Sequence, residues 1–144
     1  MEIKQDQGTN ELNMSNFLPL RPTMGDDFPV LLWRLIRMVG LPKILGEDAS
    51  VAVYLVGKDI GKMLKIKNIE ELADKLTQLK IGKIILSSKT KDYLLVEIGE
   101  CLTCSGITPI VGRPVCQLET GIITGALESL YPDKKIIGEE TKKY

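Results

Sequence analysis

ECLTCSGITPIVGRPVCQLETGIITG, residues 100 to 125, is the segment around which the rest of the chain is organised. It contains all three cysteines, Cys101, Cys104 and Cys116, and four of the thirteen glycines. A strand is expected to end at the CxxC pair, and a helix to begin near Pro114, because the first turn of a helix does not need the N–H that proline lacks. Cys116 then falls in the first helical turn, where backbone N–H groups and the helix dipole favour a thiolate. We therefore expect the functional centre here.

The composition is that of one ordinary globular domain: 144 residues, of which 44% are hydrophobic and 26% are charged. Nineteen basic and nineteen acidic residues cancel, which argues against nucleic acid or an anionic membrane as a partner. There is no histidine, so the usual general base and the commonest metal ligand are missing. An odd number of cysteines argues against a secreted disulfide framework. With no signal-peptide pattern and no apolar run long enough to cross a bilayer, we expect a cytoplasmic protein.

The order of the expected elements is that of an α+β protein, with N-terminal helices packed on a small antiparallel sheet and a C-terminal strand-helix-strand unit. Residues 1–25 read as a polar arm and residues 26–144 as a single domain. The pattern predicts helices over 26–39, 49–64 and from 68 to the glycine at 82, strands over 83–88 and 92–98, a helix over 114–130 and a last strand over 135–140. Gly40 and Pro42 are expected to stop the first helix.

Two of these helices carry glycines four residues apart, Gly57 with Gly61 and Gly121 with Gly125. A glycine inside a helix costs about 1 kcal/mol relative to alanine. We therefore expect another element to pack closely against each pair.

The first helix, FPVLLWRLIRMV, is apolar on nearly every side apart from Arg34 and Arg37. A helix of this kind is either central or covered by a partner. We predict a homodimer, since one face of the molecule cannot hide all of these residues. The predicted dimer contacts are Phe28, Leu32, Trp33 and Ile36. The alternatives are a plain core helix or the wall of a ligand cavity.

The three cysteines allow three interpretations. As thiolates they suit zinc, with Glu140 or a water molecule as the fourth ligand, and the ion would then be structural. They would otherwise be small buried residues, which is common for cysteine without a disulfide. A CxxC redox pair is the third interpretation, but the usual strand–CxxC–helix context is absent.

ECLTCSG, then GRPVCQLETGIITGALESL, then a strand ending in EETK, resembles the 4-vinyl reductase domain family over about residues 28 to 143. The resemblance implies a dimeric α+β domain that encloses a pocket for small hydrophobic molecules. Its relatives include sensors, acyl-chain-holding assembly subunits and proteins linked to vinyl-group reduction, and fold analogy does not choose among them.

In the sensor branch, the resemblance implies a structural zinc held by the cysteine of the PVC motif, here Cys116, and by a glutamate of the last strand, here Glu140. Two further cysteines would complete that site. The first position falls on Lys143, and the chain ends before the second. The residues present therefore cover half of the sensor-type site.

The expected function is the binding of a small lipophilic molecule by a non-catalytic sensor or carrier. The alternatives are a reductase, or an accessory of one, acting on the vinyl group of a tetrapyrrole-like substrate, and a dimeric scaffold. The lack of histidine and of a glycine-rich nucleotide fingerprint disfavours the enzyme. Glu119 would be a polar anchor in the pocket, or else a solvated or lysine-paired residue. The predicted lining residues are Tyr54, Ile60, Leu94, Val96, Leu118 and Ile122.

Overall fold

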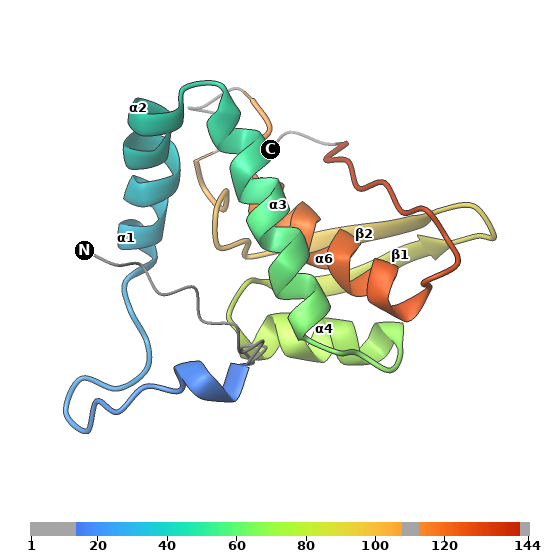
Figure 1. The fold of residues 1–144 in the computed structure, drawn as a ribbon, viewed down its shortest axis with the longest axis horizontal. Helices are drawn as coiled ribbons and strands as arrows, with labels where there is room; N and C mark the ends of the chain where they lie inside the picture. Colours follow the sequence, from blue (N-terminus) through green and yellow to red (C-terminus); the bar gives the residue numbers. More distant parts are fainter. Residues whose placement is uncertain (1–13, 108–112, 142–144) are drawn as a thin grey trace, which may run out of the picture.

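The computed structural model describes residues 14–107 and 113–141, and in this part of the chain helices accompany a two-stranded antiparallel sheet. The α+β class predicted from the sequence is confirmed (Figure 1). The elements in chain order are the 3-10 helix η1 (Met14–Phe17), α1 (Val30–Leu35), the π-helix η2 (Ile36–Gly40), α2 (Leu41–Leu45), α3 (Asp48–Met63), α4 (Ile69–Gln78), β1 (Lys83–Lys89), β2 (Leu94–Gly99) and α6 (Gln117–Leu130).

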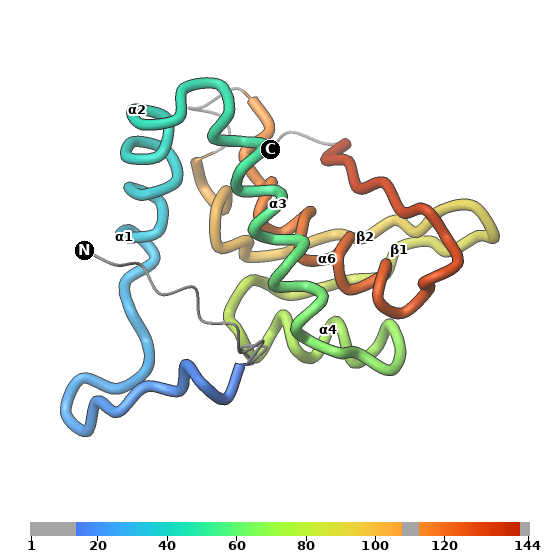
Figure 2. The backbone as a smooth tube through the Cα atoms, viewed as in Figure 1, coloured from blue at the N-terminus to red at the C-terminus, as the bar shows by residue number. Residues whose placement is uncertain are grey.

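Helices α3 and α6 cross in direct backbone contact, as the glycine pairs predict (Figure 2). A Cβ atom added to Gly61 would lie 2.1 Å from the carbonyl oxygen of Ile122, and one added to Gly125 would lie 2.1 Å from the carbonyl oxygen of Lys58. Gly57 and Gly121 are equally crowded. Only glycine leaves room for the two backbones at this distance. The crossing is the central contact of the fold.

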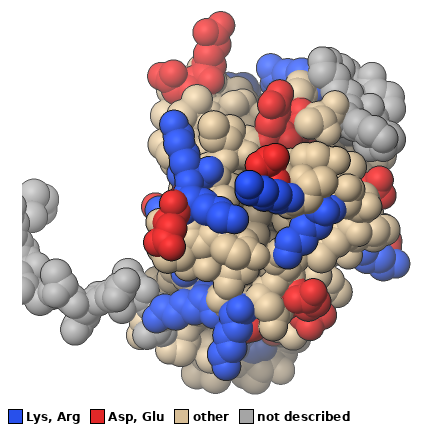
Figure 3. Space-filling model, turned by 90° about the vertical axis from the view of Figure 1, so that its right-hand side faces the viewer, with Lys and Arg blue, Asp and Glu red and all other residues tan. Residues whose placement is uncertain are grey.

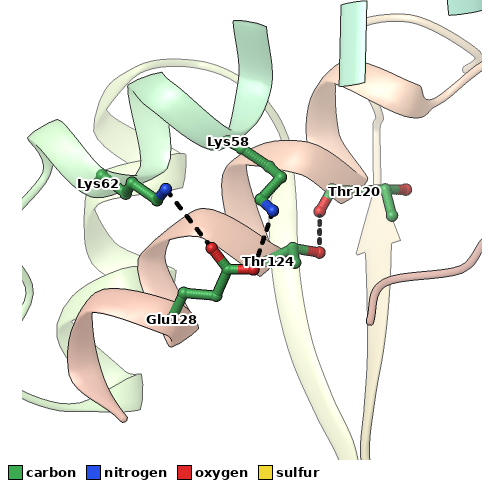
Figure 4. Close-up of polar contacts among 5 residues, drawn as sticks. All are labelled: Lys58, Lys62, Thr120, Thr124 and Glu128. Carbon is green, nitrogen blue, oxygen red and sulfur yellow. Dashed lines mark hydrogen bonds and ion pairs between the residues drawn. The ribbon is translucent and has the colours of Figure 1, made fainter. Parts of the chain in front are cut away.

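Polar side chains close one edge of this crossing. Lys58 Nζ lies 2.9 Å from one carboxylate oxygen of Glu128, and Lys62 Nζ lies 3.6 Å from the other (Figure 4). On α6, the hydroxyl of Thr124 donates to the carbonyl oxygen of Thr120 at 2.7 Å. These partly exposed ion pairs contribute little to stability because water and salt screen them, so the apolar core carries most of the stability.

The core lies where α3, α4 and α6 meet the sheet. Its buried members are Val53, Leu64, Ile66, Ile69, Leu72, Leu76, Ile81, Leu118, Ile122, Ala126 and Leu127. On α4 these side chains recur every three or four residues, as expected for one apolar face of a helix. A second, smaller cluster contains Cys101, Val115 and Cys116. The cysteine segment is thus packed inside the domain.

The predicted start of a helix at Asn68 and the predicted antiparallel pairing of the two strands are confirmed. At the start of α4, Asn68 Oδ1 accepts a hydrogen bond of 2.8 Å from the Glu71 N–H, and the Glu71 carboxylate accepts one of 2.9 Å from the Lys67 N–H, so side chains satisfy two N–H groups at the helix end. Strands β1 and β2 pair antiparallel, with Lys83 opposite Gly99 and an irregularity between Leu86 and Ser88.

The first helix differs from its predicted bounds. It begins at Val30, with Pro29 as its N-cap, and the helical path continues past Gly40 and Pro42 to Leu45. In the π-turn of η2, the Leu41 N–H bonds to the Ile36 carbonyl five residues back, and Pro42 then falls in the first turn of α2. A proline is tolerated in the first turn of a helix, so Pro42 does not end the helical path.

The C-terminal half also differs in two respects. Cys116 is the N-cap residue of α6, one position before the helix, and residues 135–140 form no strand. Gly138 lies against α6, where an added Cβ would come within 2.1 Å of Thr124 Oγ1. The segment packs on a helix and not on a sheet edge, so it has no strand to pair with.

The surface shown in Figure 3 carries basic and acidic side chains interspersed, in keeping with the zero net charge of the chain. Within the described ranges, no helix has the length and apolar character needed to cross a membrane.

Candidate metal centre

Three cysteines from two segments meet in the folded chain. Strand β2 ends at Gly99, and Glu100, with a φ of 52°, turns the backbone so that Cys101 enters the interior. Cys104 follows in the next turns, and Cys116 arrives from the N-cap of α6. The three Sγ atoms all lie within 4.8 Å of one another, and those of Cys101 and Cys116 are 3.5 Å apart. No disulfide joins these cysteines.

The thiols of Cys101 and Cys116 contact each other, and both residues are buried. A hydrogen bond from the Cys116 thiol lowers the pKa of Cys101 to about 5, and the same hydrogen bond raises the pKa of Cys116. One proton is thus shared between two sulfurs, with Cys101 favoured as the thiolate. A thiolate is the form of cysteine that binds metal.

Glu119 points a carboxyl group at this cluster from α6. The residue is 0% exposed, its Oε1 accepts a short hydrogen bond from Thr103 Oγ1, and the Cys101 sulfur lies 3.5 Å from the same oxygen. Burial, followed by the neighbouring Cys101, raises the pKa of Glu119 to about 7. Its Oε2 has no hydrogen-bond partner among the described residues. The expectation of a solvated or lysine-paired Glu119 is therefore wrong.

Glu140, the predicted fourth ligand, also reaches the cluster. Its Oε2 accepts a hydrogen bond of 3.1 Å from the backbone N–H of Cys116, and burial raises its pKa. Among the described residues, the group of potential ligand atoms within 4.8 Å of one another contains the three sulfurs and no carboxylate oxygen. The structure thus brings the three predicted cysteines together and places the carboxyl groups of Glu119 and Glu140 at the edge of the cysteine cluster.

A buried cation, Arg37, stands beside the same cluster. It is 2% exposed, and its Nη2 donates to Ser50 Oγ at 3.2 Å and to Gln117 Oε1 at 2.5 Å. Burial, followed by the positive charge of Arg113, lowers the pKa of Arg37, while electrostatic interactions with Glu119, Cys116 and Glu140 oppose this change. Its Nε has no hydrogen-bond partner among the described residues. A buried guanidinium at this place favours negative charge on the thiols and carboxylates.

Helix α1 is attached to the loop that carries the cysteines. Trp33 Nε1 donates to Thr103 Oγ1 at 3.0 Å, and Arg34 Nε donates to the Leu102 carbonyl oxygen at 2.9 Å. Sequence reasoning missed Thr103 and Arg37, and it gave Trp33 a different role. Their partners are 13 to 80 residues away along the chain, so no local pattern marks them.

The other predicted dimer residues take no part in these hydrogen bonds between α1 and the cysteine loop. Phe28, Leu32 and Ile36 are 54%, 50% and 44% exposed, whereas Trp33 is half-buried. The exposure of the first three leaves them available to a partner. The homodimer itself stays a prediction.

The predicted ligand-lining residues fall in three places. Leu118 and Ile122 are buried in the main core, with Ile60 and Leu94 packed against it. Tyr54 lines a depression of about 360 Å³ that is open to solvent, together with Ser50 and Gln117. Val96 is half-buried on β2. Their role as a ligand site stays a prediction.

Comparisons with known proteins correct the expected family. The family that matches residues 30–143 is described as "Protein of unknown function (DUF2507)", so membership of the 4-vinyl reductase family is wrong. Similar proteins come from Methanocaldococcus jannaschii. Uncharacterized protein MJ1642 is 33% identical over 116 residues, 81% of this chain and 70% of that protein. Uncharacterized protein MJ0745 is 23% identical over 111 residues, 77% of this chain and 59% of that protein.

Proposed function

We propose that this chain, which belongs to the DUF2507 family, is a metal-binding protein whose Cys101, Cys104 and Cys116 hold one zinc ion. The observation that supports this proposal is the mutual distance of their sulfur atoms, all within 4.8 Å. With a Zn–S bond of about 2.3 Å, two sulfurs of a tetrahedral site lie about 3.8 Å apart. Small side-chain movements are enough to close the three sulfurs around an ion.

The chemistry of the ligands favours zinc. Soft thiolates select zinc over magnesium and calcium, which take oxygen ligands. Cys101 and Cys116 are buried, so the ion has little access to solvent or substrate, as in a structural site. Such an ion would fasten the loop after β2 to the start of α6. We therefore propose that zinc stabilises the fold and takes no part in catalysis.

Metal analysis of the purified protein tests the proposal. We expect one zinc ion per chain in the wild type by native mass spectrometry. Cys104→Ser and Cys116→Ser should lose it, whereas Ser105→Ala, an exposed change within the same loop, should retain it. A wild-type protein that stays metal-free in the presence of zinc, under reducing conditions, would overturn the proposal.

A second proposal concerns the apolar surface of α1, η2 and α3. Exposed side chains on these helices include Leu31, Leu32, Leu35, Ile36, Val39, Val51, Leu55 and Val56. Exposed apolar surface on this scale is typical of an interaction site. We propose that a second copy of the chain covers it in a homodimer. A small lipophilic molecule on the same surface is the competing occupant, and dimer measurements in the presence and absence of an apolar probe distinguish the two.

A further inference from the structure

We infer that the fourth ligand of this metal is the carboxylate of Glu119, and that Glu140 holds Cys116 in place without binding the ion. The inference rests on the proposed zinc site and assigns its remaining position. It replaces the ligand that the sequence predicts with one that lies inside the domain.

Burial and hydrogen bonding single out Glu119. The residue has no exposed surface, and its Oε2 lacks a partner among the described residues. A buried polar atom without a partner is costly, because it gives up its hydrogen bonds to water. The other oxygen of the same carboxyl group is next to the Cys101 sulfur, at 3.5 Å. A metal ion among the sulfurs would supply the partner that Oε2 lacks.

The position of Glu119 along the chain suits a shared site. It follows Cys116, the N-cap residue of α6, by three residues, a spacing at which an N-cap side chain meets the first turn of its helix. Cys116 and Glu119 would thus bind one ion from the same helix end. Cys101 and Cys104 would bind it from the loop.

The surroundings of Glu119 are those of an oriented ligand. Thr103 donates to Oε1, and the Thr103 hydroxyl accepts from Trp33 Nε1 at 3.0 Å. The bond from Thr103 engages Oε1 and leaves Oε2 for the ion. Groups that hydrogen-bond to metal ligands fix their orientation in this way and contribute to affinity.

Glu140 has a different role from Glu119 in the proposed site. Its Oε2 accepts the backbone N–H of Cys116, the N-cap residue of α6, at 3.1 Å. An N–H at the start of a helix has no partner within the helix, and a carboxylate there is favoured by the helix dipole. Moving this oxygen to the metal would leave the N–H unpaired. We therefore assign Glu140 a positioning role.

The charge of the proposed site agrees with its surroundings. Three thiolates and one carboxylate around a divalent ion leave two negative charges. Arg37 is 2% exposed and stands close enough to Glu119, Cys116 and Glu140 for their charges to act on it. With neutral thiols, this buried guanidinium would have weaker compensation. Its positive charge would offset part of this negative charge.

One adjustment is required. The ligand atoms within 4.8 Å of one another are the three sulfurs, so the Glu119 side chain must rotate to bring Oε2 onto the ion.

Cobalt(II) titration tests the assignment, because cobalt replaces zinc at thiolate sites and its visible spectrum reports the number and type of ligands. Wild type, Glu119→Gln, Glu119→Cys and Glu140→Gln are compared, with Glu128→Gln as a control on the same helix. Affinity is measured by competition with a chromophoric chelator. Circular dichroism establishes which variants are folded.

We expect Glu119→Gln to bind cobalt at least about tenfold more weakly than wild type, with a weaker ligand-field band. Glu119→Cys should restore tight binding and add sulfur-to-cobalt charge-transfer intensity, which also decides the matter if Glu119→Gln does not fold. Glu140→Gln and Glu128→Gln should keep the wild-type spectrum. Unchanged binding by Glu119→Gln, or a Glu119→Cys spectrum without added sulfur character, would overturn the assignment and leave the three-cysteine site intact. A wild type that binds neither ion would overturn both proposals.

Discussion

Trp33 Nε1 lies 3.0 Å from Thr103 Oγ1, so a helix near the start of the domain is hydrogen-bonded to a residue between two cysteines, seventy positions later. The Thr103 hydroxyl in turn donates to Glu119. Beside it, Arg34 donates to the carbonyl oxygen of Leu102. The position of α1 and the geometry of the cysteine cluster therefore depend on one another.

Replacing Trp33 by phenylalanine keeps an aromatic ring and removes the donor to Thr103. We expect a loss of about 1 kcal/mol in the free energy of unfolding, the net value of one hydrogen bond. Urea denaturation measures it. Tyr93→Phe, which removes a hydroxyl from an exposed ring, should leave the stability unchanged. Equal midpoints for both variants would contradict the proposed importance of the bond.

Alanine at Gly61 and at Gly40 should have opposite effects. The added Cβ at Gly61 meets the Ile122 carbonyl oxygen at 2.1 Å, so the helices must separate, at a cost of about 1–3 kcal/mol. At Gly40 the nearest atom is 3.9 Å away, and alanine should be neutral or stabilise by up to about 1 kcal/mol. Thermal unfolding of both variants checks this. A Gly61→Ala protein as stable as wild type would show that the crossing is looser than described.

Zinc should stabilise the wild type in proportion to its occupancy. At free zinc one hundred times the dissociation constant, the expected gain is about 2.7 kcal/mol, because the ion binds the folded chain and shifts the unfolding equilibrium. A melting curve recorded with zinc, and again after a chelator is added, measures the effect. Cys104→Ser should show no gain. A wild-type melting temperature that changes neither with zinc nor with the chelator would count against a structural ion.

Leu32→Glu should convert the predicted homodimer to a monomer. Leu32 is 50% exposed on α1, and a buried, unpaired carboxylate at an interface is strongly unfavourable. Trp33 is less suitable for this test, because its hydrogen bond to Thr103 couples it to the cysteine loop. Sedimentation at micromolar concentration measures the state, with Ile85→Glu on β1 as the exposed apolar control. A monomeric wild type would end the dimer proposal.

Short-range patterns were sufficient for most of the secondary structure. The apolar period of α4 and its Asn68–Glu71 cap act within one turn, and the hairpin depends on two adjacent strands. The glycine pairs predicted close packing, because glycine inside a helix is destabilising unless something needs the space. The cysteine spacing indicated a metal site. These features depend on neighbours in the chain, so they can be read from the sequence.

Contacts between residues far apart in the chain determined the features that the sequence did not predict. Glu119 resembles a surface residue in the sequence, yet the packing of α6 removes it from water and sets it beside Cys101. Arg37 is buried, and its partner Gln117 lies eighty positions away along the chain. Residues 135–140 have the composition of a strand and pack on α6 instead. A buried charge is stable only with partners brought by other elements, and a strand forms only beside another, so both outcomes follow from the assembled fold.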